Sequence, residues 1–162
     1  PEIPNQIRKT VSALASLKTI KYLTIHTSGD YEMLKAAKDC AGSIELLGVT
    51  VLTSQTNLQN LGIKNPVKDQ VKLLVNLGIK AGLDGVIASA QDFSLIRSLS
   101  KDLKIFCPGI RGDDEEKHDQ KRVMSYADFS KISDEKSFAV IGRPIIEGDP
   151  VQNIKKIIDF SN

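Results

Sequence analysis

The chain has 162 residues, of which 41% are hydrophobic and 26% charged, a composition typical of a globular protein with a core of its own. The net charge is only +2 and aromatic residues make up 5%, so neither the basic groove nor the stacking aromatics of a nucleic-acid-binding protein are indicated. We therefore predict one soluble domain spanning residues 1–162 that binds no nucleic acid.

The cysteines and the lengths of the apolar runs argue against a disulfide-rich, zinc-binding or membrane-spanning protein. Cys40 and Cys107 stand far apart, with no CxxC pair and no histidine at metal-ligand spacing, which predicts reduced thiols in a cytoplasmic protein and no metal site. No run is long enough for a membrane helix, and the first twenty residues lack the layout of a signal peptide. Because the chain begins at Pro1, we expect either a removed initiator methionine or a part of a longer protein.

The first half of the chain predicts a helix followed by strand and helix units. Apolar residues three or four apart predict a leading helix from Pro4 to about Ile20. Short β-branched or apolar runs bounded by turn residues predict strands at Lys21–Thr27 and Glu45–Leu52, the second buried on both faces. Helices are expected between them to about Cys40, and from Pro66 to Gly78 or Gly82.

The second half repeats the same alternation. Strands are predicted at Asp84–Ala88, Lys104–Cys107 and Ser137–Ile141, and helices at Phe93–Leu99, Ser125–Phe129 and Val151–Ile158. Five strand and helix units after a leading helix indicate a parallel sheet with right-handed crossovers. Two architectures fit: an incomplete (β/α)8 TIM barrel, or a doubly wound five-stranded parallel sheet.

Polar residues follow every predicted strand. In α/β proteins, sites assemble at the carboxyl ends of the strands, so these residues are the candidate site. The longest such segment runs from Lys104 to Met124, and loops of this length inside a domain are usually functional. It carries donors that suit a phosphate, although a solvated charged loop explains it equally well. The five clusters are His26-Thr27-Ser28, Thr53-Ser54, Ser89, Pro108-Gly109-Ile110-Arg111 and Gly142-Arg143.

Seven stretches, in order along the chain and most of them at strand ends, resemble the orotidine 5'-phosphate decarboxylase family. LTS, PGIR, DQKRVM and GRPI are more specific to that family than to other phosphate-binding barrels. The resemblance implies a TIM barrel of which strands four to eight are present here, a truncated chain without strands one to three. The matching stretches are EIPNQI (2–7), TIHTSG (24–29), LLGVTVLTS (46–54), DGVIASAQ (84–91), PGIR (108–111), DQKRVMS (119–125) and IGRPI (141–145).

The resemblance also implies roles for individual residues. Gln120, Arg143 and the backbone N–H of Gly142 would hold the substrate phosphate, a role that a planar guanidinium and a backbone amide suit chemically. Taken alone, Gly142-Arg143 is more often a turn with a surface charge. Four further residues match family positions: Thr53 and Arg111 as substrate contacts, Pro108 as pocket lining, and Ser89 as the serine that bonds the pyrimidine.

For two of the matched residues, a structural role explains the residue without any contact to a substrate. Ser89 serves equally well as the N-cap of a helix starting at Gln91. His26 is interpreted as structural, because a lone histidine at a strand end is more often satisfied by its neighbours than catalytic.

The catalytic motif departs from the family pattern. The family decarboxylates orotidine monophosphate to UMP and CO2 without a cofactor, using an Asp-Lys-Asp-Lys array drawn mostly from DxKxxDIPNT, and such an array works only through fixed charges. Here Glu2 occupies the place of the last Asp, Gln6 replaces the Thr, and the lysine positions fall before Pro1. Glu2 is therefore only a weak catalytic candidate, and we expect the isolated chain to be inactive.

Three functions remain open from the sequence. The first is an orotidine 5'-phosphate decarboxylase of pyrimidine biosynthesis, with orotidine monophosphate or UMP as ligand. The second is a non-catalytic nucleotide-phosphate-binding or oligomerisation remnant. The third, another barrel decarboxylase or aldolase acting on a sugar phosphate, fits LTS and PGIR less well. Since a five-strand arc leaves open edges, we expect a homodimer or a partner chain that supplies the missing strands.

Overall fold

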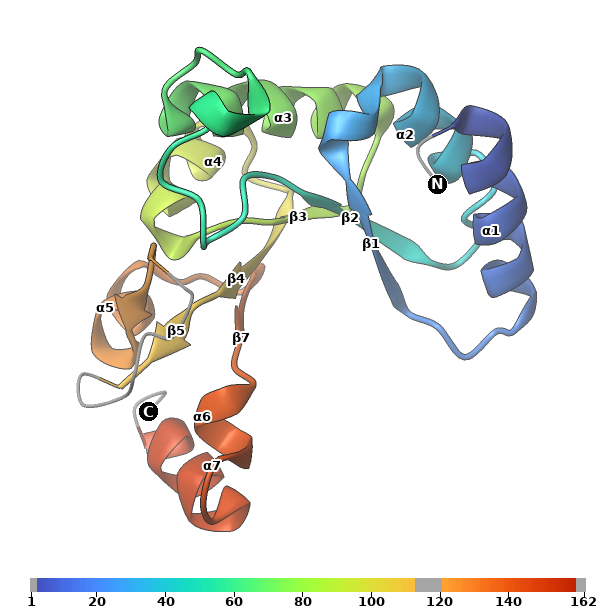
Figure 1. Ribbon diagram of the computed structural model, residues 1–162. Helices are drawn as coiled ribbons and strands as arrows, with labels where there is room; N and C mark the ends of the chain where they lie inside the picture. Colours follow the sequence, from blue (N-terminus) through green and yellow to red (C-terminus); the bar gives the residue numbers. More distant parts are fainter. Residues whose placement is uncertain (1–2, 113–120, 160–162) are drawn as a thin grey trace.

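The computed structural model describes residues 3–112 and 121–159, and its main elements follow the predicted order. Figure 1 shows them along the chain. They are α1 (Pro4–Ser16), β1 (Tyr22–His26), α2 (Asp30–Lys38), β2 (Glu45–Val49), α3 (Val67–Ala81), β3 (Gly85–Ile87), α4 (Phe93–Leu99), β4 (Lys104–Pro108), β5 (Ile110–Arg111), β6 (Met124–Ser125), α5 (Tyr126–Ile132), β7 (Ser137–Val140), α6 (Arg143–Ile146) and α7 (Pro150–Asp159).

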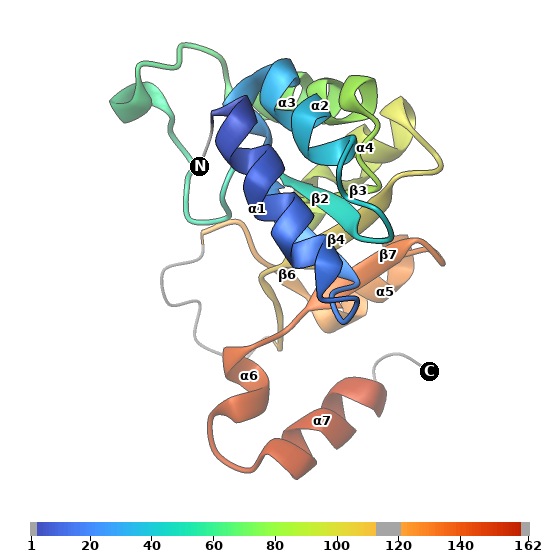
Figure 2. The ribbon, with the colours of Figure 1, turned by 90° about the vertical axis from the view of Figure 1, so that its right-hand side faces the viewer.

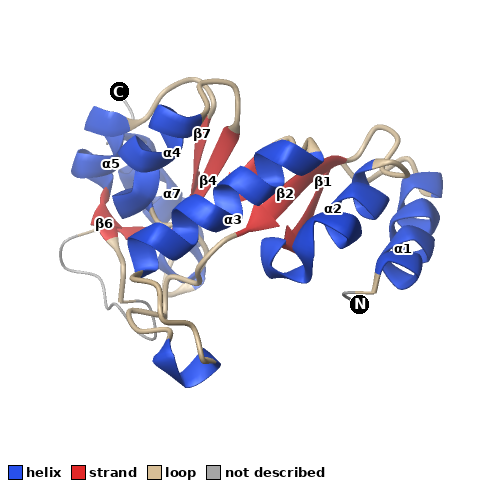
Figure 3. Cartoon of the chain, turned by 90° about the horizontal axis from the view of Figure 1, so that it is seen from above, coloured by secondary structure: helices blue, strands red, loops and turns tan. Residues whose placement is uncertain are grey.

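The five main strands form one parallel sheet in the order β1-β2-β3-β4-β7. Each strand therefore pairs with the next along the chain, as in a barrel, and the order never reverses. A doubly wound sheet requires such a reversal, so that alternative is wrong. In Figures 1 and 3, helices α1 to α5 follow the outside of the curved sheet, which makes the molecule an arc of a (β/α)8 barrel.

The core lies between the sheet and these outer helices. Leu46 in β2, Val86 in β3 and Ile105 in β4 face the helices and are completely buried. The expectation that Glu45–Leu52 is buried on both faces holds only in the middle of β2, where Leu47 is buried while Glu45 and Val49 are half-buried. The sheet thus has a packed outer face and a partly covered inner face.

Aromatic side chains span the inner face. Phe106 of β4 stacks on Phe138 of the neighbouring β7, with ring centroids 4.6 Å apart, and meets Tyr22 of β1 edge-on at 5.2 Å. Strands β1 and β4 are separated by two strands, so this contact requires strong curvature. Gly85 of β3 lets the neighbouring strands approach closely, because a Cβ there would lie 2.7 Å from both Leu47 and the Lys104 carbonyl oxygen.

The leading helix is shorter than predicted, and three short elements were not predicted. The leading helix ends at Ser16 rather than near Ile20, because Lys18 has a φ of 56°, in the left-handed region that a helix cannot continue through. Helix α6 and the strands β5 and β6 were not predicted. Figure 2 shows α6 and α7 set apart from the other helices, and the partly buried Ile157 of α7 packs against the core.

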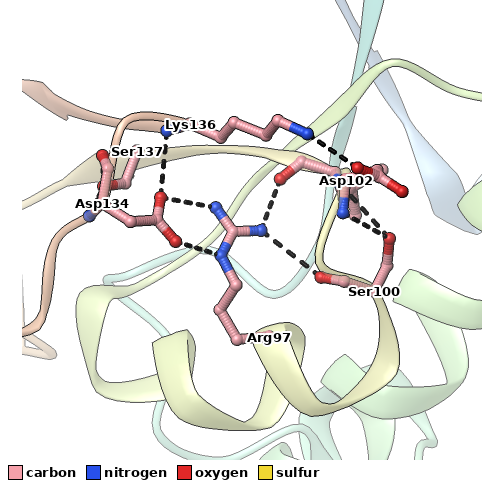
Figure 4. A network of polar contacts seen from close by, with 7 residues as sticks. Arg97, Ser100, Asp102, Asp134, Lys136 and Ser137 are labelled. Carbon is pink, nitrogen blue, oxygen red and sulfur yellow. Dashed lines mark hydrogen bonds and ion pairs between the residues drawn. The ribbon is translucent and has the colours of Figure 1, made fainter.

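A polar network ties the amino-terminal ends of β4 and β7 together (Figure 4). Arg97, in the last turn of α4, donates from Nε and Nη2 to the Asp134 carboxylate at 2.5 and 2.9 Å and from Nη1 to the Leu103 carbonyl at 2.6 Å. Lys136 forms an ion pair of 2.7 Å with Asp102. In barrels this edge serves stability, so the network joins helix to sheet rather than forming a site. Over the described ranges, no helix is long and apolar enough to cross a membrane.

Candidate functional site

A pocket of about 250 Å³ opens at the carboxyl ends of β2, β3 and β4, the edge where the sequence places the site. Thr53, predicted to contact the substrate, and Pro108, predicted to line the pocket, line it together. They come from segments 55 residues apart that the parallel sheet brings to one edge. The remaining lining residues are Val49, Val51, Leu52, Ser54, Ile87 and Ala88.

The segment that precedes β6 holds Thr53 in place. The Thr53 carbonyl accepts hydrogen bonds from the backbone amides of Lys121 and Arg122, at 3.1 and 3.0 Å. The DQKR stretch therefore ends against the LTS turn, although the two are far apart in sequence. Gln120 itself, like Glu2, lies outside the described residues, so their predicted roles stay predictions.

Ser89 sits at the tip of β3 and is completely buried. Its hydroxyl accepts a hydrogen bond from the Gln91 amide at 3.3 Å and donates one to the Arg122 carbonyl at 3.2 Å. The predicted capping role is confirmed, with the helical turn beginning at Ala90 rather than Gln91. The predicted bond to a pyrimidine stays a prediction.

The ends of the long loop are held side by side by the two-stranded sheet of β5 and β6. Ile110 pairs with Met124 and Arg111 with Ser125, and the Met124 amide donates to the Gly109 carbonyl at 3.1 Å. Gly109 has a φ of +83°, which suits glycine at the sharp turn between β4 and β5. Arg111, expected to contact the substrate, is buried at the base of this loop, 5% exposed.

Gly142 and Arg143 follow β7, the neighbour of β4. The pairing of Pro108 with Val140 places the PGIR and GRP segments at adjacent strand ends. Gly142 is exposed and precedes α6, in which Arg143 is the first residue and half-buried. The geometry therefore brings the predicted phosphate donor Arg143 to the same edge as Thr53 and Pro108.

Arg122 and Asp92 form a buried ion pair that sequence reasoning missed. Arg122 Nη1 donates to Asp92 Oδ2 at 2.6 Å, and Nη2 donates to the Val51 carbonyl at 2.8 Å. Both side chains are less than a tenth exposed. Arg122 belongs to the DQKRVM stretch, but its partner stands 30 residues earlier in the chain, so no local pattern points to the pair.

Two residues near this edge, Cys107 and His26, do not line the pocket. Cys107, in the middle of β4, faces the outer helices, and burial raises the pKa of its thiol to about 12. It is therefore a protonated core residue at neutral pH. His26 is exposed at the end of β1, and the chain is fixed there instead by the buried Thr27, whose hydroxyl donates to the Val49 carbonyl at 2.8 Å. The described residues contain no cluster of His, Cys, Asp or Glu arranged to bind a metal ion.

Comparison with known proteins places this arrangement in one group. A family model described as "Orotidine 5'-phosphate decarboxylase / HUMPS family" matches residues 3–157. The chain is 42% identical over 164 residues to orotidine 5'-phosphate decarboxylase of Ehrlichia chaffeensis and 39% identical over 165 residues to that of Opitutus terrae. These alignments cover 97% of this chain and 69% and 70% of the relatives.

Solved structures give the same fold. The structure of orotidine 5'-phosphate decarboxylase from Lactobacillus acidophilus superposes with a TM-score of 0.79 at 28% identity, covering 99% of this chain and 71% of that chain. The Methanocaldococcus jannaschii enzyme, solved with the inhibitor BMP, shares the fold at a TM-score of 0.70 and 18% identity. The five-strand arc therefore corresponds to about 70% of the barrels it resembles.

Proposed function

Because the chain belongs to the orotidine 5'-phosphate decarboxylase / HUMPS family, we propose that it supplies the nucleotide-binding strand ends of an enzyme that converts orotidine monophosphate to UMP and CO2. The observation that carries this proposal is the convergence of Thr53, Pro108 and Arg143 on the carboxyl edge of consecutive parallel strands. The reaction belongs to pyrimidine biosynthesis, which we place in the cytoplasm.

The proposed ligand contacts divide between phosphate and base. Arg143, the Gly142 amide and Gln120 hold the phosphate, because a guanidinium and backbone amides bind a dianion with charge-assisted hydrogen bonds. Thr53 and Pro108 line the pocket for the rest of the nucleotide. At about 250 Å³ that pocket is smaller than most ligand sites, so it receives one end of the nucleotide while the phosphate lies outside it. Arg111 and Ser89 complete the proposed contacts.

Decarboxylation requires an ammonium group and carboxylates that these strand ends do not supply. Decarboxylation without a cofactor needs an ammonium beside the carbon that loses CO2 and carboxylates that hold it. Glu2, at the place of a family Asp, is the weak catalytic candidate of this chain. We therefore propose that the 162-residue polypeptide binds the nucleotide but is inactive until another segment or chain provides the lysine.

An assay separates binding from turnover. With the polypeptide of 162 residues, we expect UMP binding by calorimetry and no UMP production from orotidine monophosphate above the uncatalysed rate. Turnover at an enzymatic rate would contradict the proposed inactivity. Absence of UMP binding would contradict the site itself.

The Arg143→Ala variant tests directly whether Arg143 binds the phosphate. Losing a charge-assisted contact should weaken UMP binding by about 1.5–3 kcal/mol, roughly 10- to 150-fold. Affinity for uridine, which lacks the phosphate, should not change. Arg8→Ala, which removes an exposed arginine from α1, is the matched control and should bind UMP normally. An Arg143→Ala affinity within about twofold of the original chain would show that Arg143 does not hold the phosphate.

The open sheet supports a second candidate role in assembly. Within the described ranges, β1 pairs only with β2 and β7 only with β4, and the inner-face residue Val140 is 45% exposed. Unpaired strand edges are templates for another chain. We propose that this edge is covered by a second copy or by a chain that supplies further strands, so that oligomerisation accompanies nucleotide binding.

A further inference from the structure

Arg122 lies where three segments of the carboxyl edge meet. Its guanidinium bonds Asp92 after β3 and the Val51 carbonyl after β2, at 2.6 and 2.8 Å. Its amide donates to the Thr53 carbonyl at 3.0 Å, and its carbonyl accepts from the Ser89 hydroxyl at 3.2 Å. One residue thus fixes both ends of the Val51-Leu52-Thr53 turn and the tip of β3.

The guanidinium is built into the protein rather than offered to a ligand. Arg122 is 7% exposed, and its Nη1 and Nη2 donate to Asp92 and Val51. Asp92, also 7% exposed, supplies the charge that a buried guanidinium requires. Held in this way, the guanidinium acts on a ligand through the residues that it fixes.

We propose that Arg122, held by Asp92, is a positioning residue that sets Thr53 and Ser89 for the nucleotide. This inference rests on the proposed function, since it assigns the purpose of the pair to that site. The planar fork of arginine is necessary, because one group must donate in two directions, to Asp92 and to Val51. Lysine keeps the charge but lacks that fixed geometry, so Arg122→Lys should hold the turn less well.

The opposite edge of the sheet supplies a matched control. Arg97 pairs with Asp134 and also bonds the backbone carbonyl of Leu103, so it combines the same contacts as Arg122. It stands at the amino-terminal ends of β4 and β7 (Figure 4), away from the pocket that Thr53 lines. Arg97→Lys should therefore lower the melting temperature without changing nucleotide binding.

The experiment compares Arg122→Lys, Asp92→Asn and Arg97→Lys by UMP calorimetry and thermal melting. We expect all three to melt below the original chain, but only the first two to weaken UMP binding, by about tenfold or more. The double variant Arg122→Lys/Asp92→Asn should bind UMP no more weakly than the worse single variant, because the two residues act as one unit. UMP affinity of Arg122→Lys within twofold of the original chain would overturn the inference.

Amide hydrogen exchange separates this inference from the proposed function. The amides of Lys121 and Arg122, which donate to the Thr53 carbonyl, should lose protection in Arg122→Lys and keep it in Arg97→Lys. Retained protection in Arg122→Lys overturns the positioning role even if the chain binds UMP. If Arg122→Lys loses this protection but the original chain binds no UMP, Arg122 still positions Thr53, and the proposed nucleotide-binding function is the claim that is wrong.

Discussion

Cys107 and Cys40 are both free thiols, and their surroundings predict opposite reactivity. Burial raises the pKa of Cys107 to about 12, so the reactive thiolate is scarce at pH 8. Cys40 is only half-buried. We expect iodoacetamide to label Cys40 in the folded chain and Cys107 only in denaturant, as read by peptide mass spectrometry. Equal labelling rates without denaturant would contradict the buried position of β4.

The ion pair between Asp134 and Arg97 should make the stability of the folded chain depend on pH. The ion pair with Arg97 lowers the pKa of Asp134 below its ordinary value of 3.8. A lowered folded-state pKa gives stability that is present above the unfolded value and lost as pH falls through the folded value. Because the Asp134 side chain is 40% exposed, solvent limits the contribution to about 1 kcal/mol or less.

Chemical denaturation of Asp134→Asn measures that contribution. The variant should be less stable by this amount at pH 7, and the difference should shrink as the pH falls below about 3.8. Lys131, whose ion pair with Asp128 is exposed on both sides, offers a control. Lys131→Gln should change stability far less. An Asp134→Asn deficit that is constant down to pH 2 would refute the titration argument.

Sequence reasoning identified residues whose location follows from their place at a strand end. Thr53 and Pro108 could be assigned to one pocket because carboxyl ends of parallel strands share an edge, and Ser89 could be assigned as a cap from its position before a helix. Arg122 and Asp92 could not be paired, because a buried ion pair between distant segments depends on how those segments pack. The sequence predicted the pocket edge but not what holds it together.

Among the elements, β3 depends on its first residue having no side chain. A Cβ on Gly85 would lie 2.7 Å from the Lys104 carbonyl oxygen and from Leu47, and backbone cannot move aside cheaply. Gly85→Ala should therefore destabilise the chain by about 1–3 kcal/mol, measured by urea denaturation. Gly62→Ala is a useful comparison, because a Cβ there meets nothing within 4 Å and only its φ of +71° is strained. Unchanged stability in Gly85→Ala would mean that β3 and β4 are not paired as described.

The elements that sequence analysis missed are the short ones. Strands β5 and β6 have two residues each and α6 has four, too few for an apolar period to be recognised. The long elements were found because residues that become buried recur in them at regular spacing. In the structure, β4 alternates between buried and half-buried residues, and α3 buries one side against the sheet. The short elements matter most at the site, since β5 and β6 hold the base of the loop between Arg111 and Ser125.

For the whole molecule, the open arc predicts self-association. Phe106, Phe138 and Tyr22 form an apolar inner face, and the edge strand β7 ends in Val140, which is 45% exposed. We expect native mass measurements at micromolar concentration to show a dimer or larger assembly. Val140→Lys should shift the assembly toward monomer, because a charge on a strand edge discourages pairing. Lys131→Gln serves again as the control, and a stable, well-folded monomer of the original chain would exclude this proposal.

The successive strand order also gives the binding proposal its geometry, because it puts Thr53, Pro108, Gly142 and Arg143 at one edge and the Arg97 network at the other. Mapping UMP onto the amide spectrum of the isotope-labelled chain tests this most directly. We predict that UMP shifts the amides of Thr53, Gly142 and Arg143, and that uridine shifts Thr53 but not the other two. Shifts concentrated around Asp84, Asp102 and Lys136 at the amino-terminal edge, or the same shifts with uridine as with UMP, would contradict a phosphate site at the carboxyl ends of the strands.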